Sequence, residues 1–275
     1  MTYREALLSG EKILDMAQIV DAKNDAWLLM EMVCKIDKTF YYVHMDEEIP
    51  VDEMKEYESV LKKRAERVPL QYITGEQEFM GLTFYVNSNV LIPRQDTETL
   101  VEEALNLAKP GMRILDMCTG SGCIIISILK NKSDVKGVGC DISKQALIVA
   151  KENAKLNNVN VAFEYSDLFE NIEGKFDMIV SNPPYIRSAE IPSLMPEVAQ
   201  FEPLKALDGS EDGLEFYRRI LKESKNYLNA DGYIIFEIGN DQGEAVSNML
   251  TYAGYNNVRV IKDLAHNDRV VCAQV

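Results

Sequence analysis

The sequence has no apolar run long enough to cross a membrane, and it has few cysteines. Its longest apolar stretch, residues 123–129, falls far short of the roughly 18 residues that a membrane helix needs. The first residues lead into an amphipathic stretch and not into the apolar core of a signal peptide. Five scattered cysteines form neither a disulfide framework nor a zinc pattern. We therefore expect a soluble, cytoplasmic protein with reduced thiols, no metal and no membrane partner.

Basic segments are missing as well. The 275 residues include 29 Lys and Arg against 44 Asp and Glu, which gives a net charge of −15. Neither half of the chain around Arg94 has a basic excess. Because Lys and Arg neutralise the phosphates that dominate DNA affinity, this balance disfavours a stable nucleic-acid partner. With 47% hydrophobic and 27% charged residues, the composition fits a globular protein with one large core or two domains.

Apolar side chains recur with helical spacing over the first 70 residues, which predicts an all-helical region. One helix is expected to start at Asn24 or Asp25, either of which is a suitable cap. Another is expected to run from Asp52 to Pro69, because a proline ring ends the hydrogen-bond ladder. Short apolar segments at 78–79, 83–86 and 90–92 predict a small β-hairpin linker. The expected domains are a helical substrate-recognition domain (1–77), the linker (78–93) and an α/β domain (94–275).

Strands and helices alternate after residue 97, which predicts an α/β fold. Strands are expected at 113–117, 136–141, 161–165, 176–181, 233–238, 258–262 and 269–275, and helices at 123–130, 143–156, 213–228 and 242–253. Strands separated by helices imply right-handed crossovers and a mostly parallel, doubly wound sheet of seven strands. The last two strands have no helix between them, so we expect an antiparallel C-terminal hairpin at one edge.

A glycine-rich turn follows the first strand of the alternating region. Residues 116–122 (Asp-Met-Cys-Thr-Gly-Ser-Gly) run directly into a helix, where glycine permits close backbone approach and helix amides bind polar groups. Asp141 ends the next strand 19 residues after Gly122, a spacing that suits the two hydroxyls of a ribose. The G-x-G-x-x-G and Walker A patterns are absent, which disfavours NAD and a P-loop. We expect an adenosine-containing cofactor; a turn needed only for packing is the alternative.

The third strand ends in Ser-Asp-Leu-Phe at residues 166–169. The Asp167 carboxylate can accept a hydrogen bond from an adenine amino group, and an apolar neighbour can cover the ring. The alternative is that Asp167 only caps the following turn.

The fourth strand runs into Asn182-Pro183-Pro184-Tyr185. Residues that precede proline are restricted to extended conformations, so Asn182 and Pro183 are both stiffened. The Asn182 side-chain carbonyl and the Pro183 backbone carbonyl can then converge on the two hydrogens of a planar NH2 group. Tyr185 offers a flat face to the conjugated group that carries it. An ordinary proline-rich turn is the alternative, but N-P-P-Y at the same sheet edge as the glycine turn favours a functional site.

Residues 116–122, Asp141 and residues 182–185 resemble the motifs of class I S-adenosylmethionine-dependent methyltransferases, and N-P-P-Y is typical of those that methylate planar nitrogens. The segments PLQYITGEQEF, LIPRQDTETLVE and FEPLKALDGSEDGLEFYRRI extend the resemblance over nearly the whole chain. They resemble the HemK/PrmC family, the protein-glutamine methyltransferases of peptide chain release factors. The resemblance implies a Rossmann-like fold and methylation of the glutamine in a Gly-Gly-Gln motif, with S-adenosyl-L-methionine as donor and S-adenosyl-L-homocysteine as product.

The resemblance also implies roles for individual residues. It implies that the cofactor contacts Cys118, Thr119, Gly120, Ser121, Gly122, Asp141, Asp167, Leu168 and Asn182. Contacts with the glutamine amide fall to Asn182, Pro183, Pro184 and Tyr185, with Leu91 and Arg94 bordering the pocket; a plain interdomain ion pair is the alternative for Arg94. The family usually has Gly where this chain has Cys118, so this position has either ordinary dihedral angles or a strained turn.

The expected chemistry needs no strong base, because the methyl donor is already activated. Asn182 and Pro183 would act catalytically by holding the NH2 group in line with the donor. The main alternative is a nucleic-acid amino methyltransferase of the N6-adenine type, which would need a basic groove to bind a flipped base. A non-catalytic regulator that binds the cofactor would have no use for N-P-P-Y, and nothing in the sequence supports a haem-pathway enzyme.

Overall fold

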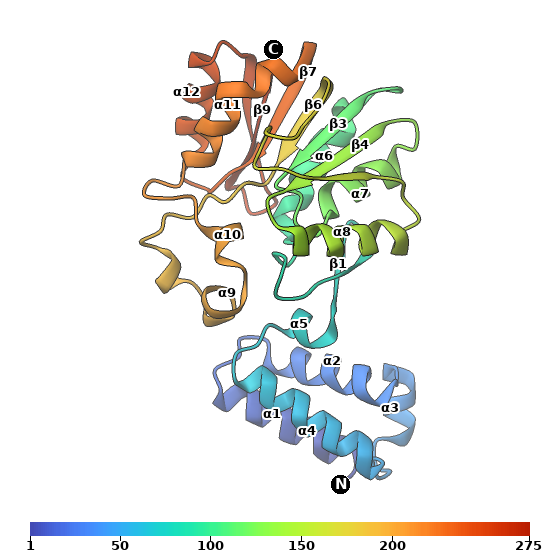
Figure 1. The fold of residues 1–275 in the computed structure, drawn as a ribbon. Helices are drawn as coiled ribbons and strands as arrows, with labels where there is room; N and C mark the ends of the chain where they lie inside the picture. Colours follow the sequence, from blue (N-terminus) through green and yellow to red (C-terminus); the bar gives the residue numbers. More distant parts are fainter. The chain divides into compact units, whose positions relative to one another are not determined.

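The computed structural model describes residues 1–275 as two compact units (Figure 1). The first unit contains Met1–Gly75 together with Met195–Phe201. The second contains Glu76–Leu194 and Glu202–Val275. A short stretch from the middle of the chain therefore belongs with the N-terminal helices. The domains predicted from the sequence are consecutive segments and so do not include this arrangement. None of the helices combines the length and the apolar character required to cross a membrane.

The first unit is entirely helical, as the sequence indicates. Its helices are α1 (Tyr3–Met16), α2 (Ala22–Cys34), α3 (Lys38–His44), α4 (Val51–Ala65), α5 (Leu70–Thr74) and α9 (Pro196–Phe201). Thr2 begins α1 with a capping box, in which its side chain and that of Glu5 each accept a backbone N–H. One apolar face of α1, α2 and α4 forms the core, which includes Leu14, Leu29 and Leu61.

Two helix boundaries differ from the prediction. Helix α2 begins at Ala22 after Asp21, and Asp25 lies inside the helix with a buried side chain, so neither Asn24 nor Asp25 is the cap. Helix α4 ends at Ala65 and does not continue to Pro69. Arg67 adopts a left-handed conformation (φ +72°), and backbone hydrogen bonds back into the last turn close the helix before the proline is reached.

The second unit is built on one seven-stranded sheet with a separate two-stranded hairpin. The sheet contains β3 (Arg113–Met117), β4 (Lys136–Asp141), β5 (Ala162–Tyr165), β6 (Phe176–Ser181), β7 (Leu228–Glu237), β8 (Asn256–Lys262) and β9 (Asp268–Gln274) in the order β5-β4-β3-β6-β7-β9-β8. The first five strands in this order are parallel, and β9 pairs antiparallel with both β7 and β8. This confirms the α/β fold and the antiparallel hairpin at one edge.

Helices cover both faces of the sheet, so the unit has three layers (Figure 1). The helices are α6 (Glu98–Leu107), α7 (Cys123–Asn131), α8 (Lys144–Leu156), α10 (Leu204–Leu207), α11 (Glu215–Tyr227) and α12 (Gly243–Tyr252), with 3-10 turns η1 (Gln95–Thr97) and η2 (Ile191–Ser193). Successive strand residues alternate between two cores: Ile114 packs on the side of α6 and α7, and Leu115 on the side of α11 and α12. The continuous apolar strands are those of a sheet buried on both faces.

The linker segment contains two strands and not three. β1 (Glu76–Phe79) pairs antiparallel with β2 (Leu82–Tyr85). Residues 90–92, expected as a strand, belong to no strand. Val90 and Ile92 are buried and produce the alternating pattern, whereas Leu91 lines a pocket.

The sheet topology brings together two of the turns that the sequence predicts to form the site. The chain runs from β3 to β4 and β5 on one side and then crosses to β6 on the other, so the strand order reverses between β3 and β6. Met117 at the end of β3 pairs with Ser181 at the end of β6, and the Ser181 hydroxyl donates to the Met117 carbonyl (2.7 Å). Ligands of open α/β sheets bind in the crevice at such a reversal. The glycine turn and N-P-P-Y both start there.

Candidate active site

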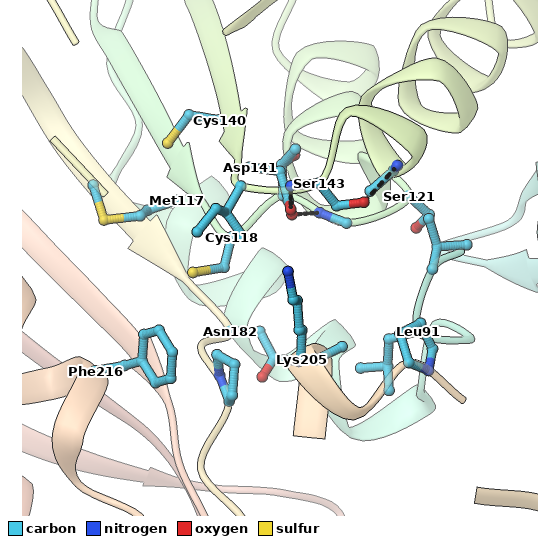
Figure 2. A pocket seen from close by; sticks show the side chains of 18 of the residues that line it. Leu91, Met117, Cys118, Ser121, Cys140, Asp141, Ser143, Asn182, Lys205 and Phe216 are labelled. Atoms are coloured by element: carbon cyan, nitrogen blue, oxygen red, sulfur yellow. Dashed lines mark hydrogen bonds between the residues drawn. The ribbon is translucent and has the colours of Figure 1, made fainter. Parts of the chain in front are cut away.

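A pocket of about 660 Å³ opens at this edge of the sheet. Its walls come from the turns that follow β3, β4, β5 and β6, from residues 89–94 and from residues 203–208. Figure 2 shows Leu91, Cys118, Asp141, Asn182 and Lys205 around its open centre. The volume is within the range of small-molecule sites, about 300–1,000 Å³.

The two glycines of the glycine turn have different roles, one beside the pocket and one in the packing of the helix that follows. Gly120 (φ +55°) has open space where a side chain would stand, and it lines the pocket. Gly122 (φ +80°) precedes α7 and does not line the pocket; a Cβ there would stand 2.9 Å from Ile126. The turn therefore presents Cys118, Thr119, Gly120 and Ser121 to the pocket, whereas Gly122 serves the packing of the helix.

Asp116 lies beneath this turn and is fully buried. The Thr119 hydroxyl donates to its Oδ2 (2.5 Å), while Oδ1 has no hydrogen-bond partner. Burial raises the pKa of the Asp116 carboxyl to about 7, and the bond from Thr119 opposes that shift. Asp116 does not line the pocket, so its place in the site is to hold the turn from beneath through Thr119.

Cys118 adopts a left-handed backbone conformation (φ +61°), so of the two possibilities left by the sequence the turn is the strained one. Its side chain packs partly buried against the core on the α11 side. Burial raises the pKa of the thiol well above its usual value, so the thiol is not a nucleophile at neutral pH.

Asp141 is held in place by backbone groups from two segments. Gly120 N–H donates to its Oδ2 (2.9 Å) and Ser143 N–H donates to its Oδ1 (2.8 Å). Burial raises the pKa of this carboxyl, and the two bonds counteract the shift. Each oxygen keeps a further lone pair for a ligand, which fits a pair of ribose hydroxyls. Ser143 also caps α8, as the sequence predicts.

Asp167 and Leu168 line the same pocket after β5. Asp167 Oδ1 accepts a hydrogen bond from Arg219 of α11 (2.7 Å). Leu168 is buried and adopts a left-handed conformation (φ +51°). Arg219 and its neighbour Phe216 complete this end of the pocket. Both lie in the segment FEPLKALDGSEDGLEFYRRI, but neither is among the site residues that the sequence predicts.

The N-P-P-Y segment divides into two parts. Asn182 and Pro184 line the pocket, whereas Pro183 and Tyr185 do not. The Tyr185 ring packs against the core on the α11 side, and its hydroxyl donates to Glu237 Oε1 (3.3 Å). Tyr185 thus faces away from the place where a flat substrate face was expected, and in this structure it anchors the segment.

A glycine-containing loop supports this segment from behind. Side chains at Gly209 or Gly213 would collide with the backbone of Tyr185, at 2.8 Å and 2.4 Å. Gln242 donates to the carbonyls of Tyr185 (3.0 Å) and Gly213 (3.3 Å) and accepts from Gly239 N–H (2.9 Å). These contacts explain why residues 208–213 combine two glycines with turn-forming acids.

Leu91 and Arg94 both line the pocket, together with Lys205. Arg94 forms an ion pair with the buried Glu202 of the same unit, so it is not an interdomain pair. Lys205 enters no ion pair or hydrogen bond, and its side chain extends into the pocket (Figure 2). It is a free cation available to a carboxylate. It lies in the segment FEPLKALDGSEDGLEFYRRI, but no pattern there predicts that it lines the pocket.

Comparison with known proteins agrees with this geometry. Residues 5–75 match the family described as PrmC N-terminal domain, and residues 95–198 match the Methyltransferase small domain. A methyltransferase structure from Pyrococcus furiosus aligns with a TM-score of 0.54 and 18% identity, over 70% of this chain and 89% of that one. Fold and pocket together define a class I methyltransferase.

Curated relatives specify the family. The chain is 42% identical to the release factor glutamine methyltransferase of Clostridium acetobutylicum, over 99% of this chain and 98% of the relative. It is 37% identical to the protein of the same name from Geobacter sulfurreducens, over the full length of both. This chain belongs to the family of release factor glutamine methyltransferases.

Proposed function

We propose that this protein transfers a methyl group from S-adenosyl-L-methionine to the side-chain amide nitrogen of the glutamine in the Gly-Gly-Gln motif of a peptide chain release factor. The observation that carries the proposal is the position of Asn182 in one pocket with the glycine turn and Asp141. The names of the full-length relatives support the same substrate.

The pocket residues fit this cofactor. Asp141 has two fixed carboxylate oxygens for the ribose. Leu168 is an apolar residue for the adenine ring, and Gly120 leaves room beside the backbone. The cofactor, when bound, supplies a methyl group that is already activated on a sulfonium.

The protein's own task is to hold the amide nitrogen. The Asn182 side-chain carbonyl, in the pocket wall, would accept one N–H of the glutamine side chain. The sequence assigns the other N–H to the carbonyl of Pro183, a residue that lies outside the pocket lining in this structure. These bonds raise electron density on nitrogen and fix its direction of attack, and positioning of this kind supplies about 7–11 kcal/mol in favourable cases. The proton leaves after transfer, when the nitrogen carries positive charge, so no histidine base is needed.

The helical first unit would be the domain that recognises the folded release factor, and the enzyme would act in the cytoplasm with the translation machinery. No stable nucleic-acid partner is proposed, because the net charge of −15 disfavours binding to phosphates.

Labelled donor tests the proposal directly. We would incubate the protein with purified release factor, with its Gly-Gly-Gln Gln→Ala variant, and with duplex DNA. Label is expected in the release factor only and should be lost in the Gln→Ala variant. Label in DNA but not in protein would show instead an N6-adenine type of activity.

A further inference from the structure

Glu237 is a buried carboxylate directly behind the N-P-P-Y segment. It is the last residue of β7, only 2% of its surface is exposed, and it does not line the pocket. Tyr185 donates to Oε1, whereas Oε2 is buried without a hydrogen-bond partner. A buried carboxylate with one open acceptor is costly, so its presence calls for a function.

Thr97 lies between this carboxylate and the acceptor pocket. It ends the 3-10 turn η1, is 2% exposed and borders the pocket. Its hydroxyl oxygen accepts a hydrogen bond from Asn182 Nδ2 (3.4 Å). On its other side the hydroxyl interacts with the Glu237 carboxylate and thereby lowers the pKa of that group. Asn182 and Tyr185, the two ends of N-P-P-Y, are thus connected through Thr97 and Glu237.

We propose that Glu237 acts through Thr97 to fix which way the Asn182 amide points. A carboxylate can only accept, so in this proposal the Thr97 hydroxyl directs its proton to the open acceptor of the neighbouring Glu237 carboxylate. The Thr97 oxygen is then left as an acceptor and binds the NH2 side of the Asn182 amide. Asn182 Oδ1 is thereby turned to the pocket, where it meets the N–H of the acceptor. Glu237 and Thr97 are positioning residues in this scheme, which rests on the proposed function.

The opposite amide orientation would prevent the reaction. Asn182 Nδ2 would face the substrate NH2, so that two donors would meet, and Oδ1 would face the lone pairs of the Thr97 oxygen. Asparagine by itself has no preference between these orientations, because its oxygen and nitrogen ends have nearly the same shape. The preference therefore has to come from a neighbour of fixed polarity, and Glu237 is such a neighbour.

The surroundings of Glu237 make this preference sensitive to pH. Burial raises the pKa of its carboxyl to about 7, while hydrogen bonds from Thr97 and Tyr185 and the charge of Arg269 lower it. Asp96 raises it, although Asp96 is itself paired with Arg269 (3.0 Å). The carboxylate form is the one that orders Thr97, and it predominates above the pKa. Methyl transfer should therefore rise with pH through the neutral range.

Four variants test the inference: Thr97→Ser, Thr97→Val, Glu237→Gln and, as a matched control, Glu103→Gln, a buried carboxylate on α6 that pairs with Arg259. For each we would measure kcat, KM for the release factor and cofactor affinity across neutral pH. Thr97→Val and Glu237→Gln should lower kcat about 10- to 100-fold, as expected for the loss of a hydrogen bond to a charged group. Cofactor affinity should stay within about threefold.

The conservative variants separate orientation from stability. Thr97→Ser keeps the hydroxyl and should restore most of kcat, and Glu103→Gln should keep both kcat and the pH profile. Glu237→Gln should remove the rise near pH 7. If the parent enzyme methylates the release factor while Thr97→Val and Glu237→Gln match it in kcat, the inference is wrong and the proposed function stands. A loss confined to cofactor affinity or to thermal stability also overturns it. Failure of the parent enzyme to label any release factor would instead contradict the proposed function.

Discussion

Two residues of the pocket carry backbone strain that glycine would avoid. Cys118 and Leu168 adopt φ values of +61° and +51°, and a left-handed conformation costs an ordinary residue roughly 1–2 kcal/mol. Both stand where the turns after β3 and β5 bend around the pocket. The family resemblance implies glycine at the position of Cys118, a residue that would adopt this conformation without strain.

Replacing Cys118 by glycine should therefore stabilise the turn relative to replacing it by alanine. Both variants lose the thiol and its packing, but only Cys118→Ala keeps a Cβ in the left-handed region. We expect the glycine variant to exceed the alanine variant by about 1 kcal/mol in unfolding free energy. Differential scanning calorimetry of the two proteins would measure this, and equal stability would show that the turn is not strained.

In the proposed mechanism, Asn182 is the residue on which the chemistry depends. Asn182→Ala should lower kcat by about 10²–10³-fold, the usual effect of removing one preorganised polar group from an active site. Donor binding, followed by calorimetric titration, should change little. Asn106→Ala on the exposed side of α6 serves as the control and should behave like the parent. Retention of turnover in Asn182→Ala would exclude the acceptor role.

Sequence patterns could identify only part of this site. Asp141 and Asn182 lie at strand ends inside recognisable motifs, so spacing alone predicted that they share a pocket. Glu237 lies in none of the quoted segments, and LIPRQDTETLVE contains Thr97 without indicating its role. Thr97 contacts Asn182 across 85 positions of the chain, a contact that only the folded sheet creates. The motif identified Tyr185 as a candidate but could not predict where its side chain points, because that orientation depends on the hydrogen bond to the buried Glu237.

At the scale of elements, the buried parallel strands were the most predictable. The bounds of β3, β4 and β6 agree with the apolar runs residue by residue, because both faces of these strands are covered. Helix ends were less predictable: α4 stops four residues before Pro69 through backbone hydrogen bonds that any sequence can make. The short helices α9 and α10 have too few turns for a periodic pattern to show.

Helices α2, α4 and α9 are joined by a buried charge cluster. Arg64 pairs with Asp25 (2.7 Å) and Glu197 (3.0 Å), and the side chains of all three are less than a tenth exposed. Arg67 also pairs with Glu197 (2.9 Å), so removing Arg64 leaves chiefly the buried Asp25 without a compensating charge. The cluster is therefore a sensitive point of the first unit, and it ties residues 195–201 to that unit.

Arg64→Ala should destabilise the first unit by about 3–5 kcal/mol. Trp27 is the only tryptophan in the chain and lies in α2, packed edge-on against Tyr41, so its fluorescence in urea reports this unit selectively. Arg4→Ala, which breaks the exposed pair with Asp46, is the control and should barely move the transition. Similar transitions for both variants would show that the buried cluster adds no stability.

At the scale of the whole molecule, the two units depend on each other through the chain path. The helical unit begins with Met1–Gly75 and is completed by Met195–Phe201, so the chain leaves the methyltransferase unit and returns to it within seven residues. Those seven residues are flanked by N-P-P-Y on one side and by Glu202, Leu204 and Lys205 of the pocket region on the other.

Deleting residues 1–75 should abolish most activity on the release factor while cofactor binding persists. We expect a loss of at least about 100-fold in kcat/KM, since the proposed docking unit is gone. The deletion also removes Arg64, an ion-pair partner of Glu197. A second truncated protein therefore carries Glu197→Gln, which removes the unpaired charge. Titration with donor checks that the truncated proteins retain the pocket. Undiminished methylation of the release factor would refute a docking role for the helices.

The shared path of the chain also restricts how such an enzyme can be recombined. A chimera with its crossover at residue 75 would take residues 1–75 from one parent and residues 195–201 from the other. Residues 195–201 contain Glu197, the carboxylate that pairs with Arg64. Functional chimeras should therefore inherit both pieces from one parent. The proposed recognition unit is consequently not a detachable module, and its ancestry should follow that of the second unit.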